Sequence, residues 1–529
     1  MNPILPTLIV SFLLTSLLQA ASPIDNAQEQ WPMASGPDGT WTTTSDQAVP
    51  TEWSVSTDQN ILWKTELPEG GQSGTAVWKD RLFLTINRPL PEVTPLENAE
   101  GSDIIGYCLD SNTGEVLWTR EIPSPKTMPY SGLFSDNTSC TPITDGKHVW
   151  FINHGGLMVC YDMKGNEIWN RSFESRSRHN AKQAEPILVD DQLLFVMMRE
   201  PNDPLRRPML AKPRQRNTPP EHWPKMHIRS FDALTGEPLW TEPSGTSVHN
   251  TPRFGYIDGE AHIFHARGGG HEPPEMPYGY SMSLVGGEAL WNYEANDAAA
   301  YTVSHFNEKH AYGWDAGNLL QFDSKTGDIT NSFPSFEKAD IRLWDTDRNR
   351  YNLHRDSPFT IVAENFRTYP TNQTPILVGK YYLFLSHSGH CIGRIDTETG
   401  KTEFLQVPIQ VVRKPGSAEQ SLWDSHIPSQ GRNSRGMRTA NDKRSERDGW
   451  GHVTAGSPIA VNEYVFFSTM IGMTYVVDSQ APVFDKNALV SINDLGPASD
   501  TWSLSTVSYA NGRIFHRGLK HVVCVDSSK

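Results

Sequence analysis

The sequence predicts an all-β fold: an eight-bladed β-propeller of four-stranded antiparallel blades, closed by an N-terminal strand. Three observations lead to this prediction. A strand–turn–strand unit recurs along the chain, its copies follow at intervals of roughly 40–50 residues, and the two ends of the chain carry complementary parts of one unit. A repeat made only of strands and turns is typical of a propeller rather than of a helical solenoid.

The repeat unit is clearest at residues 106–123. An apolar strand ends at Asp110, a Ser-Asn-Thr-Gly turn follows, and Gly114 is free to take a positive φ. The next strand alternates apolar and polar residues and carries Trp118 on its apolar side. Because a lone hairpin is only marginally stable in water, such a unit needs neighbouring copies to pack against.

Further copies carry the same Asp, Gly and Trp positions. They lie at residues 161–169, 231–240, 284–291, 322–328 and 395–401, with degenerate copies at 477–478 and 525–526. Asn331 and Phe404 stand where the fifth and sixth copies should carry tryptophan. The repeat tryptophans are Trp63, Trp118, Trp169, Trp240 and Trp291.

The chain divides into three parts. Residues 1–20 read as a signal peptide, with an apolar run followed by small residues for cleavage; an N-terminal membrane anchor is the alternative, and no transmembrane segment is expected after removal of the signal. Residues 21–58 read as an arm on the propeller surface, with Trp31, Trp41 and Trp53 spaced through it. Residues 59–529 form the propeller.

Ring closure is predicted from the two ends of the propeller. Residues 61–68 match the Trp-bearing strand of the repeat without the strands that should precede it, and the last copy stops at Asp526 before its own Trp-bearing strand. Together the two fragments complete one blade. Closing the ring in this way removes exposed sheet edges.

Three insertions lengthen the spacing between repeats, near residues 199–226, 334–370 and 409–452. Long loops in a compact fold are usually functional or disordered. Residues 345–349 alternate oxygen-bearing side chains as a calcium loop does, although Arg350 stands where an EF-hand needs glycine. A solvated acidic loop is the preferred interpretation of this segment.

Composition narrows the possible partners. The net charge is −15, from 46 Lys and Arg against 61 Asp and Glu, which weighs against nucleic acid as a partner. The five widely spaced cysteines imply no disulfide framework. Cys108, Cys160 and Cys524 each precede the repeat Asp by two residues, which favours packed core residues; a Cys140–Cys160 bridge is the alternative for one blade.

The Asp-x-x-Thr-Gly-Glu-x-x-Trp repeat resembles that of the PQQ-like (pyrroloquinoline-quinone-like) β-propeller family over roughly residues 60–529. The leading Trp31-Pro32 and the Gly-Pro-Asp-Gly stretch at 36–39 resemble the start of secreted bacterial members. The resemblance implies eight blades held together by the repeat tryptophans, with weaker contacts at Asn331 and Phe404.

The same resemblance implies two kinds of function, because the family contains quinoprotein dehydrogenases and non-catalytic scaffolds. The dehydrogenases typically carry adjacent cysteines under the quinone, a tryptophan platform and a Glu/Asn/Asp calcium site, whereas this sequence has no Cys-Cys pair. The scaffolds include the propeller lipoprotein of the outer-membrane barrel assembly machinery. No cysteine for lipid attachment follows the predicted signal peptide.

Candidate ligand contacts lie in the loops that precede the first strand of each unit, because propellers place such contacts on loops around the axis. The alternative is that these polar side chains merely satisfy backbone groups of the loops. A glycine-rich stretch at 268–270, flanked by histidines, is expected to line the axis; its spacing matches no metal motif. The candidates are His179, His249, Asn250, Arg267, His271, Glu272, His452 and Trp502.

The sequence therefore favours a periplasmic or secreted protein that acts as a non-catalytic binding or assembly module, with a monomer as the expected state. Its ligand is expected to be a small molecule, a glycan or a protein partner. No catalytic residue, metal site or cofactor is assigned. The alternative is a quinoprotein-type oxidoreductase for alcohols or sugars, which would bring PQQ and calcium, and a sugar-processing enzyme comes third.

Overall fold

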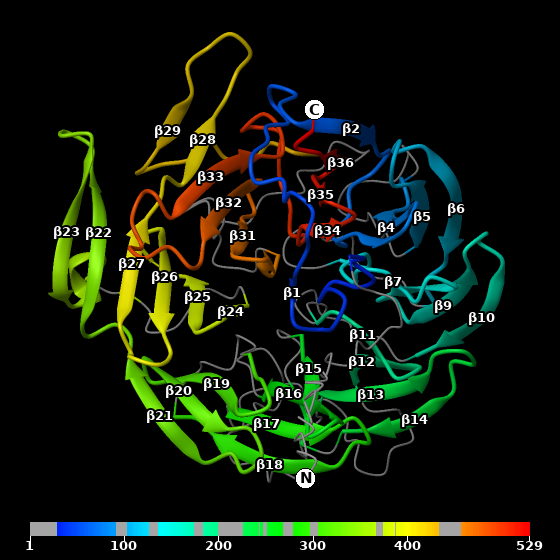
Figure 1. Cartoon of the computed structure of the whole chain (residues 1–529). Coiled ribbons are helices and arrows are strands. Elements are labelled where there is room, and N and C mark those ends of the chain that lie inside the picture. Colours follow the sequence, from blue (N-terminus) through cyan, green and yellow to red (C-terminus); the bar gives the residue numbers. More distant parts are fainter. Residues whose placement is uncertain are drawn as a thin grey trace, which may run out of the picture.

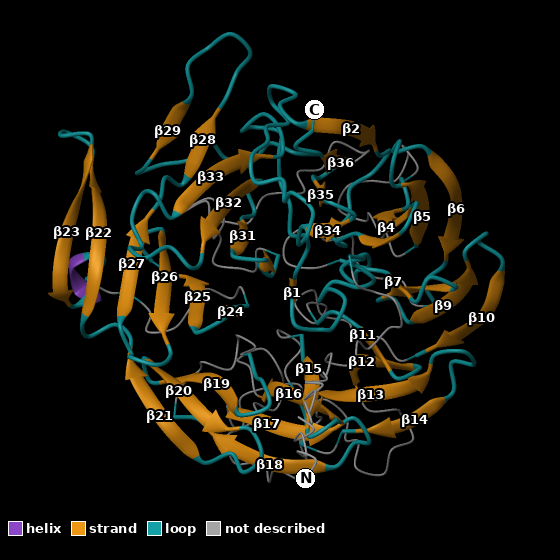
Figure 2. Cartoon of the chain, viewed as in Figure 1, coloured by secondary structure: helices purple, strands orange, loops and turns teal. Residues whose placement is uncertain are grey.

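The computed structural model describes residues 29–90, 103–125, 136–173, 184–198, 226–242, 244–246, 251–267, 279–296, 305–364, 366, 374–386, 388–432 and 456–528. Small antiparallel sheets follow one another around a central axis in a closed ring (Figure 1). Strands account for nearly all the regular structure, with one short 3₁₀ turn, η4 (Phe359–Ile361), in the described part (Figure 2). The predicted eight-bladed β-propeller is confirmed.

The first four blades each contain four strands, ordered from the axis outward. The first is β3 (Ala76–Trp78), β4 (Arg81–Asn87), β5 (Ile104–Asp110) and β6 (Val116–Ile122); the second is β7 (Ile143–Thr144), β8 (His148–Asn153), β9 (Leu157–Asp162) and β10 (Glu167–Ser172). The third is β11 (Ile187–Val189), β12 (Gln192–Met198), β13 (Met226–Asp232) and β14 (Pro238–Thr241); the fourth is β15 (Arg253–Ile257), β16 (Glu260–Arg267), β17 (Gly279–Leu284) and β18 (Ala289–Glu294).

The other four blades vary this plan. The fifth is β19 (His310–Asp315), β20 (Asn318–Asp323) and β21 (Ile329–Pro334), with an isolated bridge from Phe306 to Ala311 on its inner side. The sixth is β24 (Ile376–Val378), β25 (Tyr381–Leu385), β26 (Cys391–Asp396) and β27 (Thr402–Gln406), extended outward by β22 (Ala339–Asp345) and β23 (Arg350–Ser357). The seventh is β30 (Ile459–Val461), β31 (Tyr464–Ser468), β32 (Met473–Asp478) and β33 (Leu489–Asp494); the eighth is β34 (Ser508–Ala510), β35 (Arg513–Arg517) and β36 (His521–Val525), completed by β2 (Ile61–Glu66).

The repeat Asp and Gly shape the turn between the third and fourth strands of a blade. In the first blade, Asp110 Oδ1 accepts hydrogen bonds from the backbone N–H groups of Asn112 and Thr113, and Gly114 takes a φ of 75°. An aspartate carboxylate that caps the turn in this way supplies acceptors for N–H groups that the strands leave unpaired. The same capping recurs at Asp162, Asp232, Asp323 and Asp396.

The repeat Trp of one blade packs against this turn in the next blade. A Cβ added to Gly114 would lie 2.6 Å from the ring of Trp63, so the indole lies directly against the glycine. Four of the indoles also donate Nε1–H to the carbonyl of the residue after the repeat Asp. These pairs are Trp63–Ser111, Trp118–Met163, Trp169–Ala233 and Trp291–Ser324, at 2.9–3.1 Å.

Trp240 is the exception among the five tryptophans. Its ring lies against Gly287 of the fourth blade, but its Nε1 donates to Gln192 Oε1 within its own blade, at 2.7 Å. The fourth copy of the repeat has Leu284 in place of the Asp. The packing part of the contact therefore persists where the capped Asp turn is absent.

Two positions differ from the alignment of the repeats. Asn331 pairs with Gln321 as expected for the tryptophan position, but it is Phe333 that packs against Gly400 of the next blade, where an added Cβ would lie 3.0 Å from the ring. In the sixth blade Phe404 pairs with Gly393 and is fully buried, so the expectation that it replaces the docking Trp was wrong. The other outer strands shift register beside the turn, whereas β27 pairs with β26 without a shift.

Glu403 therefore occupies the tryptophan position of the sixth blade, opposite Arg394. The carboxylate pairs with the Arg394 guanidinium at 2.5 Å, and Arg394 Nη1 donates to the carbonyls of Ser479 and Ala481 in the seventh blade. Ser479 follows the repeat Asp478 directly, so its carbonyl corresponds to the acceptor that tryptophan Nε1 uses elsewhere. A buried Arg–Glu pair thus makes the contact between these two blades.

The ring closes as the sequence predicts. β2 pairs antiparallel with β36, with Trp63 opposite Cys524, and so supplies the outer strand of the eighth blade. The N-terminal and C-terminal parts of the propeller lie side by side in Figure 1. Because this blade contains both ends of the propeller, unfolding either end exposes a sheet edge.

The N-terminal arm lies only partly on the surface, so the expectation of a surface arm was wrong for the segments that carry its tryptophans. Trp31, Trp41 and Trp53 are at most 1% exposed. The backbone of Trp31 pairs with Val77 of β3 through two hydrogen bonds, and β1 (Thr42–Thr43) pairs with β30 near the centre of the ring (Figure 1). We call residues 30–43 the plug, because they enter the axis of the ring and bury the large apolar surfaces of Trp31 and Trp41 there.

The plug contacts the inner strands of several blades. Pro32 O accepts a hydrogen bond from Thr144 N, Trp41 O accepts one from Ala460 N, and Gly39 lies against the ring of Phe254. Its two ends bond to turns that follow inner strands, since Asn511 N donates to Glu29 O and Asn462 N donates to Thr43 O. The plug therefore enters from the face that carries the turns between first and second strands, which we call the turn face.

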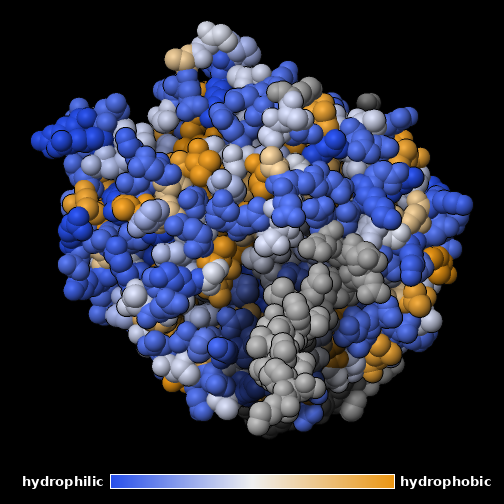
Figure 3. All heavy atoms as spheres, viewed as in Figure 1, coloured by the Kyte–Doolittle hydropathy of each residue, from blue (hydrophilic) through white to orange (hydrophobic). Residues whose placement is uncertain are grey.

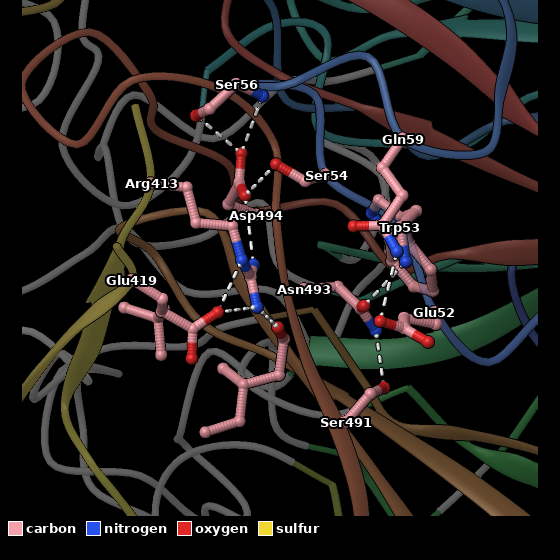
Figure 4. Close-up of polar contacts among 12 residues, drawn as sticks. Glu52, Trp53, Ser54, Ser56, Gln59, Arg413, Glu419, Ser491, Asn493 and Asp494 are labelled. Atoms are coloured by element: carbon pink, nitrogen blue, oxygen red, sulfur yellow. Dashed lines mark hydrogen bonds and ion pairs between the residues drawn. The ribbon is translucent and has the colours of Figure 1, made fainter. Parts of the chain in front are cut away.

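The rest of the arm is fixed to the outer strand of the seventh blade. Asp494 accepts hydrogen bonds from Ser54 Oγ, from Ser56 N and from Ser56 Oγ, and it forms an ion pair with Arg413 at 3.1 Å (Figure 4). Asn493 Oδ1 accepts from Trp53 N, and the Trp53 ring stacks on Phe466. The seventh blade has Ser491 in the tryptophan position, so the arm supplies the missing indole.

Two of the predicted insertions form hairpins. The insertion near 334–370 contains β22 and β23, and that near 409–452 contains β28 (Gln410–Val412) and β29 (Gln420–Leu422), while residues 199–225 and 433–455 lie outside the described residues. Trp344 and Trp423 stack at 4.6 Å and join the two hairpins. Residues 345–349 form the turn of the first hairpin, where Asp345 accepts from Arg348 N and Asn352 Nδ2.

All five cysteines are buried and free, so the alternative Cys140–Cys160 bridge was wrong. Burial raises the pKa of Cys108, Cys160 and Cys524 to about 12, which keeps them as neutral thiols. Polar residues cover most of the face seen in Figure 3, with small apolar patches between them. Within the described residues, no helix is long and apolar enough to cross a membrane, and residues 1–28, with the predicted signal peptide, lie outside them.

The Trp contact between blades predicts a specific loss of stability. Replacing Trp118 by alanine removes the ring from the Gly165 turn and the hydrogen bond to Met163 O. Trp118 is half-buried, and we expect the free energy of unfolding to fall by roughly 3–5 kcal/mol, the range of Trp-to-Ala changes in packed contacts. The neighbouring Leu117 is 41% exposed, so Leu117→Ala should change it by less than about 0.5 kcal/mol. Equal losses in urea titrations of the two variants would contradict this role.

Candidate functional site

The face opposite the turn face carries the segments through which the chain enters the inner strand of each blade, and we call it the loop face. Hydrogen bonds join these segments from blade to blade. Gly74 N donates to Thr141 Oγ1 at 2.9 Å, Thr141 N donates to Glu185 Oε2 at 2.7 Å, and Glu185 N donates to Thr251 Oγ1 at 3.0 Å. The first four blades are thus linked around the axis by side chains that each precede an inner strand, and we call these linked residues the rim.

Glu185 is the ionisable member of the rim. Both of its carboxylate oxygens accept from Thr141, one from the backbone N–H and one from the hydroxyl. Burial raises its pKa to about 7, although the two hydrogen bonds act in the opposite direction. Glu185 therefore exchanges a proton near neutral pH, on the face where the sequence places its candidate ligand contacts.

The tip of the plug meets the inner strands of the fourth and fifth blades near the axis. The Arg253 guanidinium, at the start of β15, lies 5.2 Å over the Trp41 ring and donates from Nη2 to Pro375 O at 3.2 Å. His305 lies close enough for the Arg253 charge to act on it. Asp38 Oδ1 accepts from Thr40 N and Thr40 Oγ1. We call Asp38, Arg253 and His305 the axial cluster.

Burial dominates the electrostatics of the axial cluster. It lowers the pKa of Arg253 to about 9 and raises the pKa of Asp38 above its usual range, against the hydrogen bonds from Thr40. Burial, with the charge of Arg253, lowers the pKa of His305 to about 3, so this imidazole is neutral at physiological pH. Arg253 is the group in the cluster that keeps its positive charge.

Most of the sequence-predicted site residues lie outside the described residues. This group comprises His179, His249, Asn250, His271, Glu272 and His452. The described ends of their segments lie at the loop face: β16 ends at Arg267 and β17 begins at Gly279, and Thr251 belongs to the rim. That these side chains converge on one ligand remains a prediction.

Arg267 and Trp502 are described, and they differ in exposure. Arg267 is half-buried at the loop-face end of β16, and its Nη2 donates to Tyr293 O at 3.0 Å. Burial lowers the pKa of Arg267, while the carboxylates of Glu242 and Glu294 act against that shift. Trp502 is 3% exposed and packs with Met470 and Leu519. The indole is thus buried in this cluster.

A second buried polar group lies beneath the candidate loops. Glu242 is fully buried and accepts from Ser244 N, Gly245 N and Ser283 Oγ, and its carboxylate lies 3.7 Å from His265 Nε2. These contacts hold residues 242–245, which precede His249 in the sequence, against β16, which precedes His271. His265, which lies on β16 before the glycine-rich stretch, therefore faces a carboxylate inside the blade.

The described side chains do not fit a calcium or lanthanide ion. Along the described part of the axis the carboxylate of Asp38 has a buried guanidinium beside it, and this positive charge opposes a bound cation. No group of three or more His, Cys, Asp or Glu side chains is placed to hold a metal within the described ranges. The axis itself holds the plug, with Trp31 and Trp41 fully enclosed.

The sequence could not have indicated the axial cluster by its repeats. Arg253 is the first residue of the inner strand β15, and His305 lies just before the inner edge of the fifth blade. The corresponding positions of the first two blades hold the apolar residues Ala76 and Ile143. A charged residue in an inner strand is the signal that the sequence offered. Asp38 lies in the arm, and only the folded chain shows that the arm enters the axis.

Comparison with protein families matches one part of the chain. Residues 99–206 match the family model described as "Outer membrane protein assembly factor BamB". No curated protein matches the chain. The matched part spans the outer half of the first blade, the second blade and the start of the third.

Solved structures are similar to this chain at low sequence identity. The structure described as "Europium-containing methanol dehydrogenase" is similar over 93% of this chain and 90% of its own, with 10% identity and a TM-score of 0.54. BamB from Moraxella catarrhalis is similar over 88% and 98%, with 10% identity and a TM-score of 0.44. The quinohemoprotein alcohol dehydrogenase from Comamonas testosteroni is similar over 94% and 81%, with 11% identity and a TM-score of 0.48.

The Glu242 group predicts an acid-dependent loss of stability. Burial alone would raise the pKa of Glu242, but the His265 imidazole and the hydrogen bond from Ser244 outweigh it and lower the pKa to about 2. A carboxyl group whose pKa is depressed in the folded state contributes stability above its ordinary pKa of 4.5, and the contribution is lost as pH falls toward 2.

The measurement compares melting temperatures of wild type and Glu242→Gln across this pH range. Wild type should be the more stable protein above pH 4.5, and the difference should shrink steadily as the pH falls. Glu237 is 72% exposed, so Glu237→Gln should follow wild type throughout. A difference for Glu242→Gln that does not change with pH would contradict the assigned interaction.

Proposed function

We propose that this eight-bladed β-propeller is a periplasmic or secreted binding module of the PQQ-like family. Its ligand or partner docks on the loop face, where it meets the rim and the tip of the plug. A rigid ring of blades that carries long polar loops on one face is suited to binding, because loops on a fixed scaffold present side chains without moving the core.

One observation carries this proposal: the chain closes its own axis from the turn face. Glu29 and Thr43 bond to turns on that face, and the tip of the plug carries Asp38 and Thr40, which are partly exposed. A ligand therefore approaches the axis from the loop face. The same face receives the segments that contain the predicted histidines.

The proposed contacts combine the loops with the rim. We expect His249 and Asn250, which precede the rim residue Thr251, to act with His271 and Glu272, which follow Arg267. His179 and His452 would complete the group from other blades. Imidazoles both donate and accept hydrogen bonds near neutral pH, so such a surface suits polyhydroxylated or anionic ligands.

The second candidate is a quinoprotein-type oxidoreductase that acts on an alcohol or a sugar. It is supported by the likeness in fold to the methanol dehydrogenase. Against it stand the poor fit of the described axial side chains to a cation and the lack of adjacent cysteines in the sequence. The binding-module proposal also includes a protein partner as the ligand, in line with the match to the BamB family model.

The test begins with a glycan-array and metabolite screen of the full mature chain, followed by calorimetry on variants. His249→Ala and His271→Ala should each abolish binding, because each removes a hydrogen-bonding group from the loop face, and should leave the melting temperature nearly unchanged. His354 is exposed on β23 of the outer hairpin, so His354→Ala is a matched control that should bind as wild type does.

Two outcomes would redirect the proposal. Binding that survives both substitutions would move the site away from these loops. Dye-coupled oxidation of alcohols or sugars after addition of PQQ and calcium would favour the oxidoreductase over the binding module.

A further inference from the structure

Arg253 is a buried cation without an ionic partner among the described residues. Its side chain is 2% exposed, and its hydrogen bond runs from Nη2 to Pro375 O. Nε and Nη1 are buried and have no acceptor in the described part of the chain. Buried guanidinium donors are normally satisfied, because an unpaired polar group inside a protein is strongly destabilising.

A buried arginine that contacts a neighbouring blade shows what compensation looks like. Arg394 donates from Nε and Nη2 to the Glu403 carboxylate and from Nη1 to two carbonyls. Both arginines stack on aromatic rings, since Arg394 lies 4.4 Å over Tyr381 and Arg253 lies 5.2 Å over Trp41. The carboxylate is thus the feature that Arg394 has and that Arg253 lacks.

The groups around Arg253 do not cancel its charge. His305 is neutral at physiological pH, because burial and Arg253 itself lower its pKa to about 3. The Tyr382 hydroxyl and the Asp38 carboxyl act on Arg253, but burial raises the pKa of Asp38 and its Oδ1 is engaged by Thr40. No carboxylate of the described residues forms an ion pair with this guanidinium, in contrast to Arg394 and Arg413.

From this arrangement we infer that the axial cluster binds the carboxylate of a hydroxylated acid, with a sugar acid as the ligand class. The carboxylate would pair with the free donors of Arg253, and the hydroxyl groups would donate to Asp38 and to Nε2 of His305, because the Nδ1–H of His305 donates to Phe306 O. The ligand would enter from the loop face along the partly exposed side chains of Asp38 and Thr40. The inference rests on the proposed function and specifies its ligand.

Three small probes separate charge from hydroxyl recognition. Galacturonate carries both features, its methyl ester keeps the hydroxyl groups without the charge, and acetate keeps the carboxylate without the hydroxyl groups. In calorimetry on the full mature chain, we expect galacturonate to bind about 10- to 100-fold more tightly than either of the others, as loss of a charged hydrogen bond implies.

Variants then assign the charge recognition to Arg253. Arg253→Met should abolish galacturonate binding and leave the melting temperature unchanged or higher, since it removes a buried charge that has no ionic partner. Arg394→Met is the matched control: it should lower the melting temperature, because it leaves Glu403 buried without its partner, and it should not weaken binding.

Several results would overturn the inference. Equal binding of galacturonate and its methyl ester would show that charge is not recognised, and equal binding of acetate would show that hydroxyl groups are not. A large fall in melting temperature for Arg253→Met would assign the residue a structural role. If no probe binds but a ligand from the screen binds in a His249-dependent way, the proposed function stands and this inference fails.

Discussion

The contact between a repeat indole and the turn of the next blade is the interaction on which the ring depends. Each blade is a small sheet that cannot bury its apolar faces without a neighbouring blade. The indole covers a glycine that can take positive φ, and its Nε1–H reaches a carbonyl next to the capping Asp. Packing and hydrogen bonding therefore act at one point, and the point recurs from blade to blade around the ring.

Where the tryptophan is missing, the chain connects the blades by other means. Arg394, which is paired with Glu403, donates to the carbonyl of Ser479, the position that an indole contacts in other blades. In the seventh blade the N-terminal arm brings Trp53 against Phe466 and fixes itself to Asp494. These substitutes show that the requirement is a filled interface, which a single residue type does not have to supply.

The plug turns a symmetric ring into a molecule with two different faces. By entering the axis from the turn face, residues 30–43 bury Trp31 and Trp41 and place Asp38 beside Arg253 and His305. The inner strands of a propeller converge on the axis, so residues from blades far apart in sequence become neighbours there. A charged residue on such a strand affects the axis rather than a single blade.

The sequence alone determined the features that repeat. The Asp, Gly and Trp positions predict the blades, the complementary fragments at 61–68 and 525–526 predict the closing blade, and the buried cysteines follow from their place before the repeat Asp. Local chemistry specifies each of these, because a turn and its flanking strands are encoded within a few residues.

Only the tertiary structure decided the path of the arm, the register of β27 and the axial cluster. The arm carries no repeat, so its tryptophans look alike whether they lie on the surface or inside the axis. Phe404 and Glu403 are adjacent, and a one-residue difference in pairing decides which of them faces the next blade. Asp38, Arg253 and His305 come together because ring closure brings three distant segments to one axis, and that proximity depends on long-range packing rather than on any local sequence pattern.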